Sequence, residues 1–273
     1  MNYATAASAA SLRVCALAAM GCFASAFAQQ QEKYNHPAAD PNHDLTVKEF
    51  FADIGGNFKG LISVHSIAPV LGGGAAYGLA TIPEQRIEAH FAPGDVWGAW
   101  STPGKYIGHP LVLGGASLAL FGASRKSEDR RFRSFSYALV QGMIMSSAIV
   151  LPTKEIFRRS RPSGDDSFSA FPSGHSTDSF MVATIVAEHY GWKAAVPAYA
   201  VATYVAMTRL EERKHHLTDV TAGAAIGYLV GRTVSRRLRN GPGKKVTWQI
   251  YPSRRGFLGM VSIQLPKMLD ALS

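Results

Sequence analysis

The chain has 273 residues, of which 47% are apolar and 17% are charged. This length fits one large domain or two small ones, and the apolar content is too high for a disordered chain. No Gly-X-Y period and no repeat of roughly 20–50 residues is visible, which excludes collagen-like, coiled-coil and solenoid proteins. The net charge of +9 at pH 7 suits anionic partners such as phosphate substrates, lipid head groups or nucleic acids.

The first residues have the features of a secretory signal. Arg13 precedes an apolar run over residues 14–27, and the small residues Ala26 and Ala28 suit cleavage by signal peptidase. The sequence therefore predicts a signal peptide over residues 1–28 and an exported, periplasmic or envelope-associated protein.

Both cysteines of the chain, Cys15 and Cys22, lie within this signal. Cleavage would therefore leave no disulfide, thiol nucleophile or cysteine metal site. An uncleaved membrane anchor is the alternative. A lipoprotein anchored at Cys22 fits poorly, because Ala19 and Met20 precede it.

The rest of the chain divides into an arm, a helical domain and a tail. We expect an N-terminal arm over residues 29–60, whose polar first part, 29–48, reads as extended. Six apolar segments rich in Ala, Gly, Leu and Met follow and predict six helices within a domain over residues 61–240. They cover residues 61–82, 106–124, 134–153, 176–190, 194–208 and 218–234.

The tail over residues 241–273 has a different pattern. Apolar residues alternate with polar ones over residues 246–250 and again over 261–265, with a turn sequence at 252–256 between them. The sequence thus predicts an all-α fold, a six-helix bundle core, with a short C-terminal β-hairpin.

Three cationic residues, Lys154, Arg161 and Arg209, lie near the ends of predicted helices. Arginine offers a planar fork that binds phosphoryl oxygens with two hydrogen bonds, and lysine offers a point charge. Ser173 and Gly174 lie where the fourth helix begins, and the free N–H groups of a helix start bind anions. Together these residues predict a phosphate site.

Two histidines come from different loops of this bundle, His175 and His215. One can attack phosphorus while the other protonates the leaving oxygen. Asp219 lies four residues after His215, so at helical spacing its carboxylate would accept the other ring N–H. Each cluster alone is more often a helix cap, a turn or a surface pair, and only the combination points to function.

This combination resembles the type 2 phosphatidic acid phosphatase and vanadium haloperoxidase superfamily. The family pattern is Lys-x6-Arg-Pro, Pro-Ser-Gly-His and Ser-Arg-x5-His-x3-Asp, and it matches here at every position except Thr208, which replaces Ser but keeps the hydroxyl. The matching residues are Lys154, Arg161, Pro162, Pro172, Ser173, Gly174, His175, Arg209, His215 and Asp219. The resemblance covers roughly residues 60–235.

The resemblance implies a phosphatase with a role for each residue. His215 would be the nucleophile that forms a phosphohistidine, Asp219 would orient it, and His175 would be the general acid. Lys154, Arg161, Ser173, Gly174 and Arg209 would hold the phosphoryl oxygens. No metal and no cofactor is expected, because the cations supply what Mg²⁺ supplies in other phosphoryl-transfer enzymes.

The expected partner is a phosphate-ester substrate, either a lipid-linked phosphate or pyrophosphate or a small exported ester, with contact to a membrane surface and no nucleic acid. A vanadate-dependent haloperoxidase is the first alternative. Family haloperoxidases have a longer stretch between the first two motifs, and only nine residues separate Pro162 from Pro172 here. A non-catalytic envelope protein that binds anions is the second alternative. Asp165 and Asp166 read as part of a solvated loop.

Whether the helices cross a membrane is open at this point. A span needs about 20 apolar residues, and only segments 61–82 and 134–153 qualify. Basic residues cluster over 125–133 and 232–245, on one side of a six-span arrangement, as the positive-inside rule requires. That arrangement needs a cytoplasmic N-terminus and conflicts with a cleaved signal. We favour a soluble exported bundle, with an integral inner-membrane protein whose active site faces the periplasm as the alternative.

Overall fold

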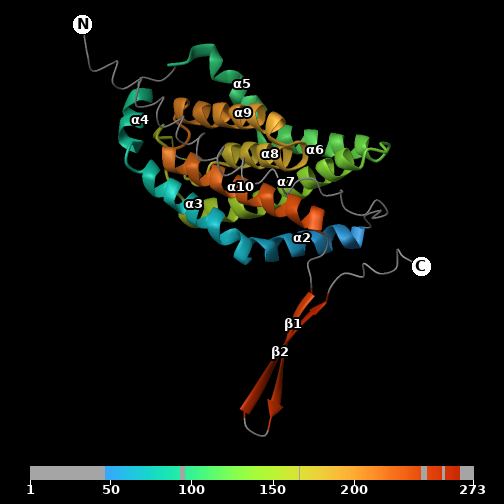
Figure 1. Cartoon of the computed structure of the whole chain (residues 1–273). Helices are drawn as coiled ribbons and strands as arrows, with labels where there is room; N and C mark the ends of the chain where they lie inside the picture. The colour runs from blue at the N-terminus through green and yellow to red at the C-terminus, as the bar shows by residue number, and fades with distance from the viewer. Residues whose placement is uncertain (1–46, 93–95, 166, 241–244, 254–255, 265–273) are drawn as a thin grey trace.

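The computed structural model describes residues 47–92, 96–165, 167–240, 245–253 and 256–264, and these are mostly helical (Figure 1). The predicted signal peptide over residues 1–28 and most of the predicted arm lie outside the described residues. The mostly helical architecture that the sequence predicted is confirmed.

Each of the six predicted segments overlaps a helix. These helices are α3 (Val64–Ala80), α6 (Pro110–Ser124), α7 (Arg130–Phe157), α8 (Gly174–Tyr190), α9 (Trp192–Glu211) and α10 (Leu217–Asn240). Three further helices were not predicted: α2 (Val47–Leu61), which occupies part of the predicted arm, and the short α4 (Glu84–Phe91) and α5 (Thr102–Ile107). A 3₁₀ turn, η2 (Gly98–Trp100), precedes α5.

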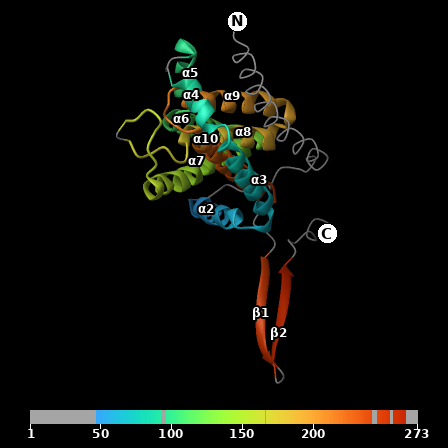
Figure 2. The same ribbon diagram turned by 90° about the vertical axis from the view of Figure 1, so that its left-hand side faces the viewer.

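In the tail, β1 (Lys245–Ser253) pairs with β2 (Gly256–Gln264) in antiparallel register, with Val246 opposite Ile263. Figure 2 shows this pair of strands projecting away from the helices.

Helix α8 lies at the centre of the helical body, in contact with α6, α7, α9 and α10 (Figures 1 and 2). Two clusters of buried apolar side chains pack around it. One joins α7, α8 and α10 through Met145, Met181 and Val230. The other joins α8, α9 and α10 to the end of α4 through residues that include Phe91 and Phe180. Burying these side chains fixes the four long helices against one another.

Helices α8 and α10 touch backbone to backbone along a row of glycines. Gly223, Gly227 and Gly231 face α8 at four-residue spacing. A Cβ at Gly227 would lie 2.2 Å from the carbonyl oxygen of Thr177, and one at Gly223 would lie 2.5 Å from that of Ser173. A Cβ at Gly231 would meet a third α8 carbonyl oxygen at 2.7 Å. No residue with a side chain fits this contact, which we call the glycine seam.

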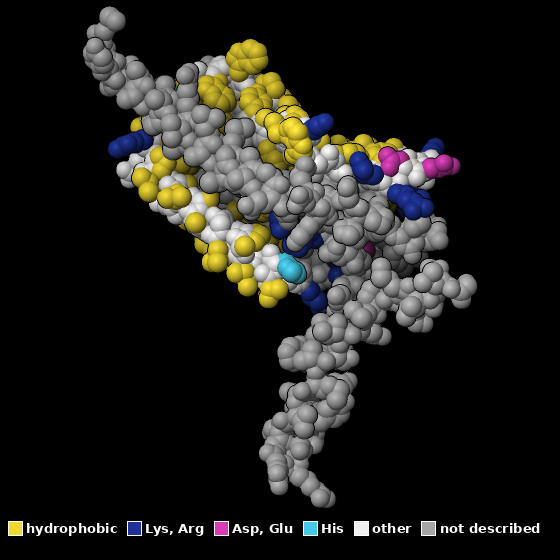
Figure 3. Space-filling view, in the orientation of Figure 1, with side chains coloured by type: hydrophobic (Ala, Val, Ile, Leu, Met, Phe, Trp, Pro, Cys, Tyr) yellow, Lys and Arg dark blue, Asp and Glu magenta, His cyan; other side chains and the backbone are white. Residues whose placement is uncertain are grey.

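Several helices expose apolar side chains. Ile62, beside α3, is 91% exposed, and Leu111 of α6 is 80% exposed. Figure 3 shows apolar side chains over much of one face. By length and composition, among the described helices only α7 could cross a membrane, or two elements if the bent pair of residues 98–107 and α6 forms one span. Segment 61–82, predicted long enough to span, gives a helix of 17 residues.

The glycine seam makes a prediction about stability. Gly227→Ala should lower the free energy of unfolding by about 1–3 kcal/mol, because the new methyl group overlaps backbone atoms that cannot move independently. Gly122→Ala is the matched control, since that glycine also lies inside a helix but has no atom within 4 Å of the place that a methyl group would take. Alanine there should be neutral or stabilise by up to about 1 kcal/mol. Thermal unfolding of both variants in detergent checks this, and equal melting temperatures would contradict it.

Candidate active site

The three sequence clusters come together at one end of the helical body. Helices α7 and α9 end there, and α8 and α10 begin there. His215 lies in the turn before α10 and is 6% exposed. Burial, followed by the nearby charges of Lys154 and Arg161 and a smaller effect of His175, lowers the pKa of His215 to about 3. All four side chains therefore belong to one electrostatic cluster.

The ring of His215 is held by a backbone carbonyl. Its Nδ1 lies 2.6 Å from the carbonyl oxygen of Ala170. A carbonyl oxygen only accepts, so Nδ1 carries the proton and donates it, and Nε2 keeps its lone pair. The neutral imidazole is thus held in the tautomer that a nucleophile needs.

The prediction that the carboxylate of Asp219 bonds to the ring of His215 is wrong. The carboxylate of Asp219 accepts from Arg159 Nη1 at 2.7 Å and from the backbone N–H of His216 at 2.8 Å. The physical reason is that α10 begins at Leu217, so His215 and Asp219 do not share a helix and the four-residue spacing does not align them. Asp219 fixes the turn that carries His215, and Ala170 fixes the ring.

Asp219 belongs to a buried polar network that the sequence did not reveal. Arg159 also donates to Thr218 Oγ1 at 2.7 Å and forms an ion pair with Glu84 at 3.1 Å. Burial raises the pKa of Asp219 despite these bonds. Burial also raises the pKa of Glu84, but hydrogen bonds from Thr218 and the charge of Arg159 outweigh it and lower that pKa overall. The network ties α4 and the loop after α7 to the start of α10.

Two of the three predicted cations, Lys154 and Arg161, hold the loop that carries Ser169. Lys154 Nζ donates to the carbonyl oxygen of Ser169, and Arg161 Nη2 donates to its hydroxyl at 2.9 Å. Arg209 is 3% exposed and donates from Nη2 to Glu212 at 2.9 Å. The cations thus lie as predicted beside the histidines, but each is engaged by a group of the protein.

The start of α8 supplies backbone donors. Ser173 is fully buried, and its hydroxyl accepts from the N–H of Ser176 at 3.5 Å while its carbonyl accepts from the N–H of Thr177 at 2.9 Å. The N–H groups of Gly174 and His175 belong to the first turn, which has no partners within the helix. A Cβ on Gly174 would meet nothing closer than Val150 at 3.7 Å, so packing does not require this glycine.

His175 projects from the same first turn. Burial, then the charge of Arg209, lowers the pKa of His175 to about 4, with a hydrogen bond to the backbone of Lys105 opposing the change. Its ring lies edge-on to that of His109, with centroids 5.6 Å apart. Nε2 is buried and has no hydrogen-bond partner among the described residues. This nitrogen is the one available to a ligand.

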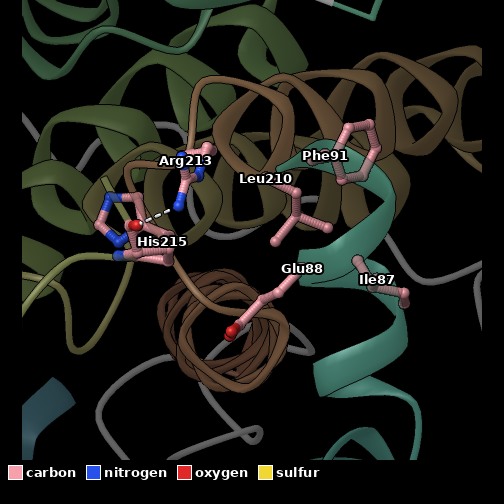
Figure 4. A pocket seen from close by; sticks show the side chains of 7 residues that line it. Ile87, Glu88, Phe91, Leu210, Arg213 and His215 are labelled. Atoms are coloured by element: carbon pink, nitrogen blue, oxygen red, sulfur yellow. Dashed lines mark hydrogen bonds between the residues drawn. The ribbon is translucent and has the colours of Figure 1, made fainter. Parts of the chain in front are cut away.

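His216 points away from the cluster. Its Nδ1 bonds to Glu88, and its Nε2 lies 3.1 Å from the carbonyl oxygen of Ser160. Glu84, Glu88 and His216 each place one potential metal-ligand atom within 4.8 Å of the other two. Hydrogen bonds to groups of the protein already engage these three side chains. A cavity of about 10 Å³, room for about one water molecule, lies beside His215. Its lining includes Ile87, Glu88, Phe91 and Leu210, which Figure 4 labels.

The loop predicted to be solvated carries one ion pair to the site. Asp165 accepts from Lys214 Nζ at 2.9 Å and lies 3.7 Å from Arg161 Nη1. The hydrogen bond to Lys214 lowers the pKa of Asp165 to about 2, so the carboxylate stays ionised at neutral pH. Asp166 lies outside the described residues.

Comparison with known proteins adds a family. Residues 135–241 match the family model described as the PAP2 superfamily, and all eight predicted site residues fall in this range. A Lipid A 1-phosphatase of Porphyromonas gingivalis is 31% identical over 119 residues, which cover 42% of this chain and 26% of that protein. A Lipid A 4'-phosphatase of Helicobacter pylori is 26% identical over 153 residues, which cover 52% of this chain and 70% of that protein.

Two further likenesses are more distant. A probable diacylglycerol pyrophosphate phosphatase of Schizosaccharomyces pombe is 30% identical over 87 residues, 27% of this chain and 31% of that protein. A crystal structure of a transmembrane PAP2 type phosphatidylglycerolphosphate phosphatase from Bacillus subtilis aligns with 62% of this chain and 92% of that chain, at 20% identity and a TM-score of 0.44.

The chain spans about a quarter of the P. gingivalis protein, so the likeness is confined to the domain that carries the site. The family match and the three motifs all lie within residues 135–241. This part of the chain belongs to the PAP2 superfamily, that of the type 2 phosphatidic acid phosphatases.

Proposed function

We propose that the chain is a phosphatase that hydrolyses a phosphate monoester or pyrophosphate ester through a phosphohistidine, without a metal ion. One observation carries the proposal. His215 is a buried imidazole whose Nδ1 proton is donated to Ala170, and the charges of the cations Lys154 and Arg161 help to lower its pKa. A neutral nitrogen nucleophile beside fixed cations suits attack on an anionic phosphoryl group.

The reaction would take two steps. In the first, Nε2 of His215 attacks phosphorus, the bond from phosphorus to the leaving oxygen breaks, and Nε2 of His175 gives that oxygen a proton. In the second, His175 takes a proton from water, the water oxygen attacks phosphorus, and the bond from phosphorus to His215 breaks to release phosphate. Lys154, Arg161, Arg209 and the N–H groups at the start of α8 would hold the phosphoryl oxygens in both steps.

The substrate itself would set the protonation of His175. With no anion bound, burial and the charge of Arg209 hold the pKa of His175 near 4, so the ring is neutral at neutral pH. A general acid must carry a proton. The negative charge of a bound phosphoryl group would oppose the cations and raise this pKa, so His175 would become protonated when substrate is bound.

A lipid phosphate is the substrate class that we favour. The named relatives are lipid A phosphatases and a diacylglycerol pyrophosphate phosphatase. The exposed apolar side chains of α3 and α6 support the same class, because a lipid surface would cover them. A small exported ester would need no such surface.

We propose that these apolar faces lie in a membrane and that the active-site end faces the periplasm. Helices α3 and α6 contain no lysine, arginine or carboxylate, yet most of their residues are exposed. The basic turn before α7 lies at the opposite end of that helix from Lys154, which fits the positive-inside rule. Release of the protein from membranes by alkaline carbonate would contradict the embedding.

Metal independence gives the central test. Hydrolysis should survive EDTA and be inhibited by vanadate, whose five-coordinate geometry imitates the transition state. The assay is phosphate release from lipid A, phosphatidic acid, undecaprenyl pyrophosphate and a soluble ester. Activity that EDTA abolishes and Mg²⁺ restores would sink the mechanism. Peroxide-dependent halide oxidation in the presence of vanadate would favour the haloperoxidase alternative instead.

The nucleophile can be separated from its neighbour. His215→Ala should lower turnover by at least about 10³-fold, because the proposed covalent intermediate forms on this ring. His216→Ala should cost a fewfold at most, since that ring bonds to Glu88 and Ser160. Acid-quenched labelling with ³²P-substrate should find phosphohistidine in the wild type and in His216→Ala. Label that persists in His215→Ala would place the nucleophile elsewhere.

A further inference from the structure

A second cavity lies far from the catalytic cluster, between α2, the start of α3 and the second half of α10. Its volume is about 210 Å³. We call it the distal cavity, and its lining residues are Gly56, Asn57, Gly60, Ser63, His65, Ser66, Leu229, Arg232, Thr233, Arg236 and Arg237. Arg232 follows Asp219 by 13 residues of the same helix, so about 20 Å along the axis separate the cavity from the active site.

Positive charge dominates this lining. Arg232, Arg236 and Arg237, all from α10, line one wall of the cavity, and no carboxylate lines it among the described residues. Arg237 Nη2 lies 3.4 Å from Asp53 Oδ1, and Arg232 Nη1 donates to the hydroxyl of Tyr228 at 2.8 Å. Three guanidinium groups in one recess are a typical site for phosphate oxygens, because each fork can donate two parallel hydrogen bonds.

The opposite wall is shaped to hold one of these groups. The guanidinium of Arg237 lies against Gly56 of α2, where a Cβ would come within 2.0 Å of its Cζ. At Gly60 a Cβ would meet the methyl group of Thr233 at 2.8 Å. The two glycines thus bring α2 close to α10 and leave Arg237 Nε buried with no hydrogen-bond partner among the described residues.

A buried amide pair lies beside the cavity. Asn57 is fully buried and its amide nitrogen donates to Gln141, while Asn57 Oδ1 and Gln141 Nε2 have no partner in the described part of the chain. These two atoms belong to one amide pair and can satisfy each other. Buried polar atoms are nearly always hydrogen-bonded, so it is the unpartnered Arg237 Nε that indicates a ligand with acceptor oxygens.

We propose that the distal cavity binds the phosphate group of an anionic phospholipid. Exposed apolar side chains next to the lining support a lipid, because Ile62, Val64 and Ile67 are 91%, 75% and 55% exposed and are neighbours in sequence of the lining residues Ser63, His65 and Ser66. Acyl chains would lie along the apolar residues, and the head group would enter the recess. The site is separate from the reaction, so it does not depend on the proposed phosphatase activity.

Binding of a phosphodiester lipid tests the proposal. Dioctanoylphosphatidylglycerol, dioctanoylphosphatidylcholine and inorganic phosphate are titrated by calorimetry into the full chain in detergent. A His215→Ala background prevents turnover. We expect phosphatidylglycerol to bind, and Arg236→Gln to weaken that binding about ten-fold or more through the loss of a charge-assisted hydrogen bond. Arg131→Gln, which removes an exposed arginine at the start of α7, is the matched control and should not change it.

Comparing phosphatidylglycerol with inorganic phosphate shows whether the cavity binds a lipid head group or free phosphate. Tighter binding of phosphatidylglycerol than of inorganic phosphate, sensitive to Arg236→Gln, identifies a lipid head group. Equal binding of inorganic phosphate with the same sensitivity identifies free phosphate as the ligand and overturns the lipid assignment. Binding that Arg236→Gln and Arg131→Gln affect equally overturns the site itself. Should Arg236→Gln not fold, Arg236→Lys and Ser66→Ala replace it, and unchanged affinity in both overturns the site.

Discussion

The contact that the active site depends on is the glycine seam between α8 and α10. Three glycines at four-residue spacing let the two backbones approach more closely than any side chain allows. The close approach places the start of α10 beside the start of α8, where the N–H of Ser173 donates to the carbonyl oxygen of Asp219 at 3.1 Å. Ser173, which caps α8, is thereby bonded to Asp219 in the first turn of α10. This bond holds together the two segments that carry His175 and His215.

The three glycines of the seam destabilise α10, and packing must offset this effect. Each glycine inside a helix costs about 1 kcal/mol relative to alanine, so α10 is a weak helix when isolated. Val230 and Val234 of this helix are fully buried in the core that it shares with α7 and α8, and their burial supplies stabilisation. The close backbone contact therefore positions the starts of α8 and α10 at the site, and the core further along the same helices stabilises that arrangement.

The long helices could be predicted from the sequence because their apolar runs are long and contain few charged residues. The helices that were missed lack this signal. Helix α4 has eight residues, of which four are charged or histidine, and α5 has six residues with a glycine among them. Helix α2 contains three glycines, which favoured an irregular arm, and its helical state reflects contacts with α7 and α10 that no local pattern encodes.

The residue types of the candidate site could be predicted, but not all of their contacts. Motif spacing identified the cations and both histidines, and the structure brings them together. It did not identify Arg159 as the partner of Asp219, since 60 residues separate them and Arg158 beside it offers the same charge. Nor could it identify Ala170, because a backbone carbonyl leaves no mark on residue type. Such contacts depend on the path of the loop and not on its composition.

Carboxylates lie next to two arginines of the candidate site. Arg209 pairs with Glu212 at 2.9 Å, and Arg161 lies 3.7 Å from Asp165. In the proposed reaction, an entering phosphoryl group would exchange places with these internal counterions, so its net affinity would be the difference between two ionic contacts. The exchange would run in reverse after hydrolysis, when the carboxylates would compete with inorganic phosphate for the guanidinium groups. A site built only of unpaired cations would hold its product tightly, whereas these internal counterions would favour its release.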